Sequence, residues 1–245
     1  RGATKGAEQY CYGIIDQDNV KRRKFYEVQS FFKEMKENEA LTQSEVKSDV
    51  AVVYDYESMA SFRIQRQSFL MDYKQEVYRL YRPFYKKNIN MDVIPSDSDF
   101  DKYKVLLLPV MIVHKKEVQD KVRKFVSGGG TVVFTYRTAV KDYYNNLTLG
   151  QFNPTYYTDL VGGYVEEVES FQDDQVAFLI GNEEFEGING TATVFRDMLK
   201  TTTAKTLFKY EDEFFEDLAA VTLNEYEGGK VYYIGSGADN TIMDA

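Results

Sequence analysis

Short apolar runs alternate with amphipathic stretches through the middle of the chain. Residues 50–54 form a run rich in β-branched residues, the pattern of a strand buried on both faces. Residues 91–94, 105–108 and 131–136 are further apolar runs that predict strands. Residues 69–84 and 118–126 instead repeat apolar side chains at helical spacing, although Pro83 should bend or end the first helix nearby. Alternating strands and helices predict an α/β fold with a mainly parallel sheet and helices on both faces.

The beginning of the chain has a different pattern. The apolar stretch over residues 10–15 predicts a strand, and residues 18–38 predict an amphipathic helix with Asp18 or Asn19 as its N-cap. A polar stretch over residues 37–49 follows and is the best candidate boundary. We therefore expect two parts, residues 1–44 and 45–245.

The last third of the chain is less regular. Residues 161–168 and 176–180 predict strands, whereas residues 194–199 fit a strand or a helix equally well. Residues 219–226 and 230–234 flank Gly228 and Gly229, and this predicts a hairpin because two glycines supply the positive φ angles of a tight turn.

Charge and composition narrow the functional classes. The 245 residues include 30 basic and 39 acidic side chains, so the net charge of −9 disfavours binding to nucleic acid. No apolar run approaches the ~20 residues of a membrane span, and no signal peptide opens the sequence, which predicts no membrane association. A single cysteine fits a reducing compartment, and we expect a cytoplasmic protein.

The residues at the ends of the predicted strands include few groups that could bind a ligand or catalyse a reaction. In a sheet of this kind, ligands bind at the carboxyl ends of the strands. Residues 55–57 are acidic and bulky where a phosphate-binding loop needs small residues, so no nucleotide or other cofactor is expected. Residues 109–112 supply no nucleophile at the strand-to-helix turn, Cys11 lies outside the α/β pattern, and His114 fits a surface or capping residue. We predict no catalytic residue and no metal site.

Several segments, in order, resemble one protein family. They are residues 6–11, 21–23, 49–57 (DVAVVYDYE), 103–109 (YKVLLLP), 125–142, 160–167, and Asn224 with 228–235. Together they resemble the part of family 42 β-galactosidases in which the catalytic barrel ends and the middle domain follows.

The resemblance implies a fold and a role. The fold would be flavodoxin-like, of the class I glutamine amidotransferase type, with its catalytic triad lost. Residues 1–44 would be the last strand remnant and final helix of the barrel, and residues 45–245 a trimerisation domain. The implied partners are two further copies of the protein in a homotrimer and the parent barrel, whose two glutamates hydrolyse terminal β-galactosides with retention. This chain itself would not be an enzyme.

The resemblance also implies a contact with substrate. Glu8 matches a family glutamate that binds galactose hydroxyls, and Cys11 stands where the family has a histidine, so these two residues would bind substrate only with the barrel present. Two other hypotheses remain open: a small amidotransferase-like enzyme with a rearranged site, and an independent carbohydrate-binding module.

Overall fold

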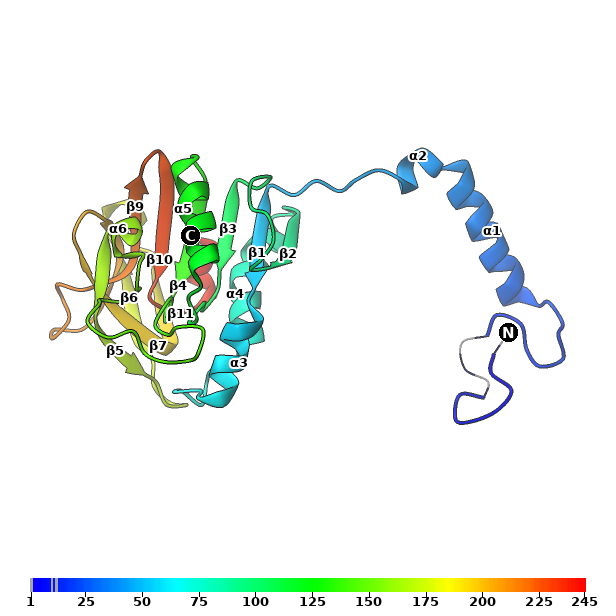
Figure 1. Cartoon of the computed structure of the whole chain (residues 1–245), viewed down its shortest axis with the longest axis horizontal. Helices are drawn as coiled ribbons and strands as arrows, with labels where there is room; N and C mark the ends of the chain where they lie inside the picture. The colour runs from blue at the N-terminus through cyan, green and yellow to red at the C-terminus, as the bar shows by residue number, and fades with distance from the viewer. Residues whose placement is uncertain (1, 10, 12) are drawn as a thin grey trace. The chain divides into compact units, whose positions relative to one another are not determined.

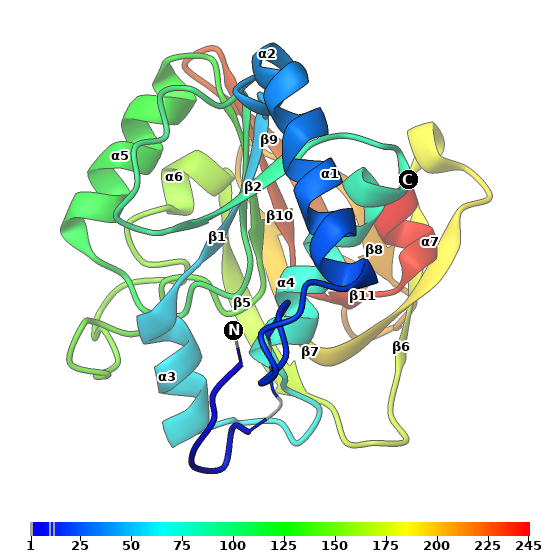
Figure 2. The same ribbon diagram turned by 90° about the vertical axis from the view of Figure 1, so that its right-hand side faces the viewer.

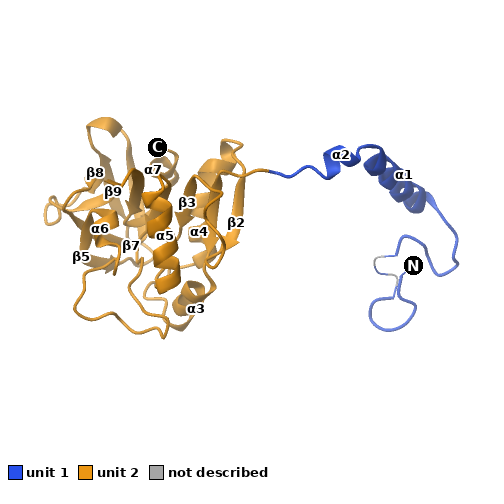
Figure 3. Cartoon of the chain, turned by 45° about the horizontal axis from the view of Figure 1, so that its top comes forward, with its two compact units in different colours: residues 1–46 blue, residues 47–245 orange. Residues whose placement is uncertain are grey.

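The computed structural model describes residues 2–9, 11 and 13–245. The chain forms two compact units, residues 1–46 and residues 47–245 (Figure 3).

Unit 1 holds two helices, α1 (Arg23–Glu37) and α2 (Glu39–Thr42). α1 begins later than the sequence predicts, because Asp18 caps no helix and its carboxylate instead accepts hydrogen bonds from Val20 N and the Arg22 guanidinium. The strand predicted over residues 10–15 is wrong for residues 11 and 13–15, which form no strand. Tyr10 and Tyr12 lie outside the described residues. Neither α1 nor α2 has a buried residue.

Unit 2 is built on one mixed sheet whose described strands number eleven. The strands are β1 (Val50–Tyr54), β2 (Met91–Pro95), β3 (Val105–Leu108), β4 (Thr131–Thr135), β5 (Gly163–Ser170), β6 (Ala177–Gly181), β7 (Asn189–Thr201), β8 (Lys205–Tyr210), β9 (Ala219–Tyr226), β10 (Gly229–Ile234) and β11 (Ser236–Ala238). Their order is β11-β7-β6-β8-β9-β10-β4-β3-β1-β2, and β5 pairs with β7. In Figure 1, β1 and β2 lie at the right of unit 2, and β5 and β6 lie at its left.

One half of the sheet is parallel. β1 pairs with β2 and β3, β3 pairs with β4, and β4 pairs with β10, all in parallel. The predicted apolar runs form these strands, and the central ones are almost fully buried. Such burial on both faces explains why their sequences lack alternation.

The other half is antiparallel, so the predicted fold class is wrong. All pairings among β5 to β9 and β11, and the β9–β10 hairpin, are antiparallel. The molecule therefore has a β-rich mixed sheet, and the predicted flavodoxin-like or amidotransferase-like fold, a mainly parallel sheet covered by helices on both faces along its whole width, is wrong. The apolar runs of residues 50–136 indicated parallel strands correctly, but beyond residue 162 only β10 joins the parallel half.

Helices pack chiefly on the parallel half. α3 (Tyr56–Ile64) and α4 (Tyr73–Lys86) contribute to one apolar cluster with Val52 and Leu107, while α5 (Lys116–Ser127) and α6 (Thr158–Val161) contribute to another with Leu106 and Phe134. Figure 2 shows α5 and α6 on one side of the sheet and α4 with α7 (Asn240–Asp244) on the other. α4 continues to Lys86 despite Pro83.

The antiparallel half has its own core. Its buried residues come mainly from β6 to β9, with Ile242 of α7 added, and one short 3₁₀ helix, η1 (Glu183–Phe185), borders it. The predicted β9–β10 hairpin forms: Gly228 has a φ of 93°, a conformation that glycine adopts without strain. Across the part of the chain that the structure describes, every helix is too short or too polar to span a membrane.

Candidate functional site

The carboxyl end of β1 holds a buried ionic cluster centred on Asp55. Its carboxylate accepts hydrogen bonds from Ser58 N (2.9 Å) and Ser96 Oγ (2.7 Å), and Lys115 Nζ lies 3.2 Å away. Lys115 also pairs with Glu57 at 2.9 Å. The acidic turn is visible in the sequence, but Ser96 and Lys115 are not, because Ser96 follows β2 and Lys115 precedes α5 and the fold alone brings them to Asp55.

In this cluster two carboxylates, Asp55 and Glu57, share one lysine, Lys115. Burial alone would raise the pKa of Asp55, but the hydrogen bonds from Ser58 and Ser96 and the charge of Lys115 outweigh burial and lower that pKa. For Lys115, burial acts to lower the pKa, whereas Glu57 and Asp55 raise it overall. Both groups are therefore charged and mutually satisfied at neutral pH. The arrangement caps α3 and fixes the turn, and it leaves no free base for catalysis.

The turn after β3 has a strained backbone. Val110 is fully buried and has a φ of 39°, an unusual value for a β-branched residue. Its N–H donates to Thr135 Oγ1 at 2.7 Å. Strained strand-to-helix turns of this kind expose the nucleophile in some hydrolases, but a valine side chain has no nucleophilic atom.

His114 lies close to this turn and is held by neutral partners. Gln119 Nε2 lies 3.1 Å from its Nδ1, and Thr148 Oγ1 lies 3.0 Å from its Nε2. An amide N–H donates to Nδ1, so Nε2 carries the proton and the ring is neutral. Burial lowers the pKa of His114, with a smaller opposing effect of Asp142. The ring also packs edge-on against Tyr156, with the centroids 5.0 Å apart.

A second buried carboxylate, Asp197, joins the two halves of the sheet. Its Oδ2 accepts hydrogen bonds from Arg137 N and Tyr233 OH, each at 2.7 Å. Its Oδ1 has no partner among the described residues, and burial raises its pKa. The side chain is almost completely inaccessible, which fits a structural link rather than a substrate site. The sequence analysis did not single out this residue.

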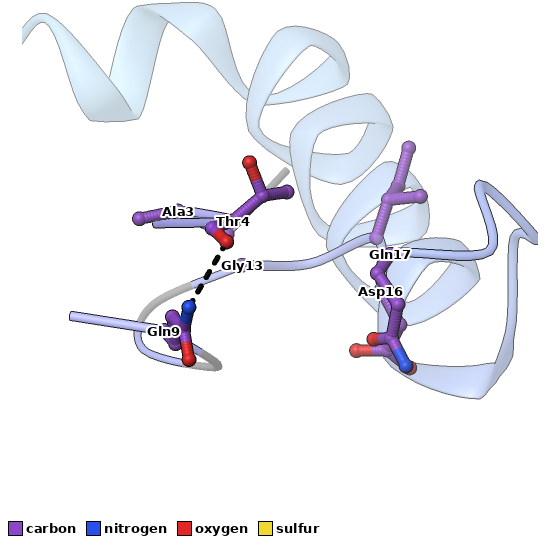
Figure 4. Close-up of a pocket in the computed structure, with 8 residues that line it drawn as sticks. Ala3, Thr4, Gln9, Gly13, Asp16 and Gln17 are labelled. Carbon is purple, nitrogen blue, oxygen red and sulfur yellow. Dashed lines mark hydrogen bonds between the residues drawn. The ribbon is translucent and has the colours of Figure 1, made fainter. Parts of the chain in front are cut away.

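The two predicted substrate-binding residues lie in unit 1. Glu8 and Cys11 are both exposed and belong to one turn, in which Cys11 N donates to Glu8 O at 3.1 Å. A neighbouring concavity of about 570 Å³ is lined by residues including Thr4, Gln9 and Asp16. Figure 4 shows Gln9 Nε2 donating to Thr4 O, at 3.1 Å. Glu8 and Cys11 do not line this concavity, so their role in binding remains a prediction.

Other reactive groupings are scarce. Within residues 2–9, 11 and 13–245, no three His, Cys, Asp or Glu side chains come together as a metal site would require. Cys11 and His114 belong to different units. The described residues thus show no assembled catalytic centre, and the remaining features of interest are surfaces.

Comparison with known proteins defines the class of protein to which this chain belongs. Residues 48–245, nearly all of unit 2, match the family model for the β-galactosidase trimerisation domain. Because the match covers most of the chain, the protein belongs to this family, as the resemblance in the sequence predicted. The described function of the family concerns assembly rather than bond cleavage.

Curated relatives are β-galactosidases. The β-galactosidase BgaA of Clostridium cellulovorans is 32% identical over 242 residues, which cover 96% of this chain and 35% of that protein. GalA of Bacillus licheniformis is 30% identical over 243 residues, with the same two shares covered. The chain thus spans about a third of the length of the curated relatives it matches.

Solved structures similar to this chain are also β-galactosidases. A β-galactosidase from Bacillus circulans sp. alkalophilus superposes with a TM-score of 0.87 at 25% identity, covering 99% of this chain and 36% of that one. A catalytic mutant of Gan42B, a GH42 β-galactosidase from G. stearothermophilus, gives a TM-score of 0.85 at 26% identity, covering 99% of this chain and 35% of that one.

Proposed function

We propose that this chain is the assembly module of a homotrimeric β-galactosidase, and that it carries no catalytic residue of the reaction itself. The match of residues 48–245 to a trimerisation-domain family carries the proposal. The parent enzyme would hydrolyse terminal β-galactosides with retention. The free thiol of Cys11 fits the reducing cytoplasm as its location.

The features of unit 2 support a role in assembly. The polar groups at the strand ends satisfy one another, as Asp55 and Lys115 do, and the strained turn holds Val110 rather than a nucleophile. Large apolar side chains nonetheless remain exposed on unit 2, among them Phe69 and Phe214 at 80% and 93%. Exposed apolar groups of this size are the usual anchors of protein interfaces.

Unit 1 has a different proposed role. Its helix α1 exposes Phe31 and Phe32 and has no buried residue, although its sequence is amphipathic. An amphipathic helix needs a surface to cover its apolar side, and the end of a catalytic barrel would provide one. In that setting we propose that Glu8 accepts hydrogen bonds from galactose hydroxyls, with Cys11 as a weaker neighbour.

Sedimentation velocity on the 245-residue chain tests the assembly role. We expect a monomer–trimer equilibrium that shifts toward trimer as concentration rises. A monomer at every concentration, with a circular dichroism spectrum showing that the chain is folded, would contradict the proposal. Calorimetric titration with galactose provides a second readout: tight binding by the chain alone would favour a carbohydrate-binding module instead.

A further inference from the structure

A homotrimer with threefold symmetry constrains its own contacts. In such a ring each copy presents one surface to the next copy and a different surface to the previous one. Two distinct and complementary patches must therefore exist on the same chain. This step rests on the proposed function, because it assumes that the domain assembles into a trimer.

Charge is divided unevenly along unit 2. Residues 47–162, which include β1 to β4, carry 17 basic and 13 acidic side chains, whereas residues 163–245 carry 5 basic and 18 acidic ones. The two halves of the sheet are therefore opposite in net charge. Contacts between unlike halves of neighbouring copies are favoured electrostatically over contacts between like halves.

The acidic half presents a protruding aromatic side chain. The β8–β9 connection, residues 211–218, exposes Phe214 to 93%, the highest value among the described large apolar residues. Its neighbours Glu213 and Glu216 are exposed as well. We call this segment, residues 211–217, the acidic knob.

The backbone of the acidic knob is held in place by Asp212 and Arg196. Phe214 N donates to Asp212 Oδ1 at 3.1 Å, and Asp212 in turn pairs with Arg196 at 3.0 Å. The guanidinium of Arg196 lies 4.8 Å from the centroid of the Phe215 ring. Phe215 is thus held against the antiparallel half, while the adjacent Phe214 is directed outward.

The basic half presents a hollow that suits this knob. A concavity lies between α3 and α4, with Met59, Phe62 and Met71 among its lining residues. Arg63, Arg66 and Lys74 also line it. We call this site the basic hollow.

The three cations of the hollow lack acidic partners. Within the part of the chain that the structure describes, none of them lies in an ion pair, in contrast to Arg79 and Lys86 of the same helix pair, which bind Glu76 and Asp244. The one carboxylate in the lining, Asp72, accepts its hydrogen bonds from Lys74 N and Gln75 N at the start of α4. The hollow therefore combines an apolar lining with uncompensated positive charge.

The knob of this chain does not occupy its own hollow, because Phe214 is 93% exposed. Three strands, β10, β4 and β3, lie between β9, which follows the knob, and β1, which precedes α3. Both sites lie at the same end of the sheet, because β9 runs antiparallel to β10 and thus begins where β1 ends. In Figure 1, α3 and the orange β8–β9 connection lie toward opposite sides of unit 2.

We infer that the acidic knob of one copy inserts into the basic hollow of a second copy of this chain, and that three such contacts close the ring. Phe214 would contact Met59 and Met71, while Glu213 and Glu216 would pair with Arg63 and Arg66. A buried aromatic ring beside arginines is the usual composition of an interface centre. The placement of the two sites at one end and on opposite halves of the sheet suits a head-to-tail ring.

Sedimentation of variants tests this contact. Phe214→Ala should weaken trimer association by at least about 30-fold, the effect typical of a central aromatic anchor. Leu149→Ala is the matched control, because Leu149 is 88% exposed on a different connection, and it should leave association unchanged. Equal loss in both variants would overturn the inference. Unchanged thermal unfolding would show that each variant still folds.

Charge reversal gives an independent readout. Arg63→Glu with Arg66→Glu should prevent assembly, as should Glu213→Lys with Glu216→Lys, and all four substitutions together should restore it. Failure of the combined variant to assemble would contradict the ionic pairing.

The outcomes separate the two proposals. A wild-type chain that remains monomeric contradicts the proposed assembly role. A wild-type trimer that tolerates both Phe214→Ala and the Arg63/Arg66 reversal leaves that role intact and overturns only the knob-and-hollow contact.

Cross-linking distinguishes a head-to-tail contact from a twofold one. In a Cys11→Ser background, Phe214→Cys with Arg63→Cys should yield covalent trimers under oxidation, and either cysteine alone should yield none. Covalent dimers from Phe214→Cys alone would show that like patches meet, and would overturn the inference.

Discussion

Two helices with similar sequence patterns have opposite environments in the two units. α1 in unit 1 repeats Phe25, Val28 and Phe32 at helical spacing but has no buried residue, whereas α4 in unit 2 buries Val77, Leu80 and three other side chains. An amphipathic pattern therefore predicts that a helix needs a covering surface. The pattern does not identify which segment of the chain supplies that surface. α4 covers the sheet of its own unit. None of the described residues of unit 1 buries a side chain of α1.

The strongest test of this comparison replaces a core residue of unit 2. Leu106 of β3 is completely buried, so Leu106→Ala should lower the free energy of unfolding by about 2–5 kcal/mol through lost burial and a residual cavity. The matched change in unit 1, Phe32→Ala, removes a side chain that is 62% exposed, and it should alter stability by less than about 0.5 kcal/mol. Urea unfolding followed by circular dichroism measures both. A large cost for Phe32→Ala would mean that α1 is covered after all.

The next largest effect concerns the buried link at Asp197. Asp197→Ala would leave Tyr233 OH and Arg137 N without their acceptor, and each unsatisfied buried donor costs about 1–3 kcal/mol. Asp197→Asn keeps an acceptor oxygen and should cost less. Unit 1 has no counterpart to this link, since its ion pairs, such as Lys24 with Asp16, are partly exposed. Equal stability of the Ala and Asn variants in urea would exclude the hydrogen bonds as the cause.

Asp197 also predicts a pH dependence. Burial raises its pKa above the ordinary 3.8, so the folded state retains the proton to higher pH than the unfolded state does. This contribution to stability is complete below pH 3.8 and is lost as pH rises through the raised pKa. Thermal unfolding measured at increasing pH above 3.8 should show this loss in the wild type relative to Asp197→Asn. Parallel pH curves for the two proteins would rule it out.

The smallest effect comes from the helix caps. Asp72 caps α4 by accepting a hydrogen bond from Lys74 N at 2.9 Å, and Asp72→Ala should cost about 1 kcal/mol. Arg22, at the same position of α1, makes no capping hydrogen bond with its side chain. Arg22→Ala should therefore leave the urea unfolding of unit 2 unchanged. A matching loss in both variants would mean that the two units unfold together.

The sequence predicted the parallel half of the sheet well. Residues 50–54 and 105–108 form β1 and β3 with the predicted bounds, because runs of branched apolar residues have few alternatives to a strand buried on both faces. The hairpin was also predicted correctly from local residues, although its turn consists of Glu227 and Gly228, with φ of 47° and 93°, and Gly229 already belongs to β10. Local chemistry was sufficient in both cases.

The antiparallel half depends on long-range pairing that sequence patterns do not show. β7 spans 13 residues and pairs with β5, β6, β9 and β11, yet residues 194–199 within it fitted a helix equally well. Val194 has a φ of 70° there, which interrupts the alternation that would mark a strand. β8 was not predicted at all, because its register is set by β6 and β9 rather than by its own sequence.

The candidate site was predicted only in part. The lack of a nucleophile after β3 follows from residues 109–112 alone. The ionic cluster of Asp55 joins Ser96 and Lys115 from positions 41 and 60 residues away, and only the strand order brings them together. Glu8 and Cys11 remain predictions, since they rest on resemblance.

The strained turn at Val110 limits any attempt to introduce catalysis into this domain by design. Its backbone already has the bend that hydrolases use, so a Val110→Cys exchange would put a thiol at the correct kind of turn. The side chain is inaccessible to solvent, however, so a substrate would have no route to that sulfur. Introducing a nucleophile would therefore not be enough. The core residues that cover position 110 would also have to be replaced by smaller ones to give a substrate access.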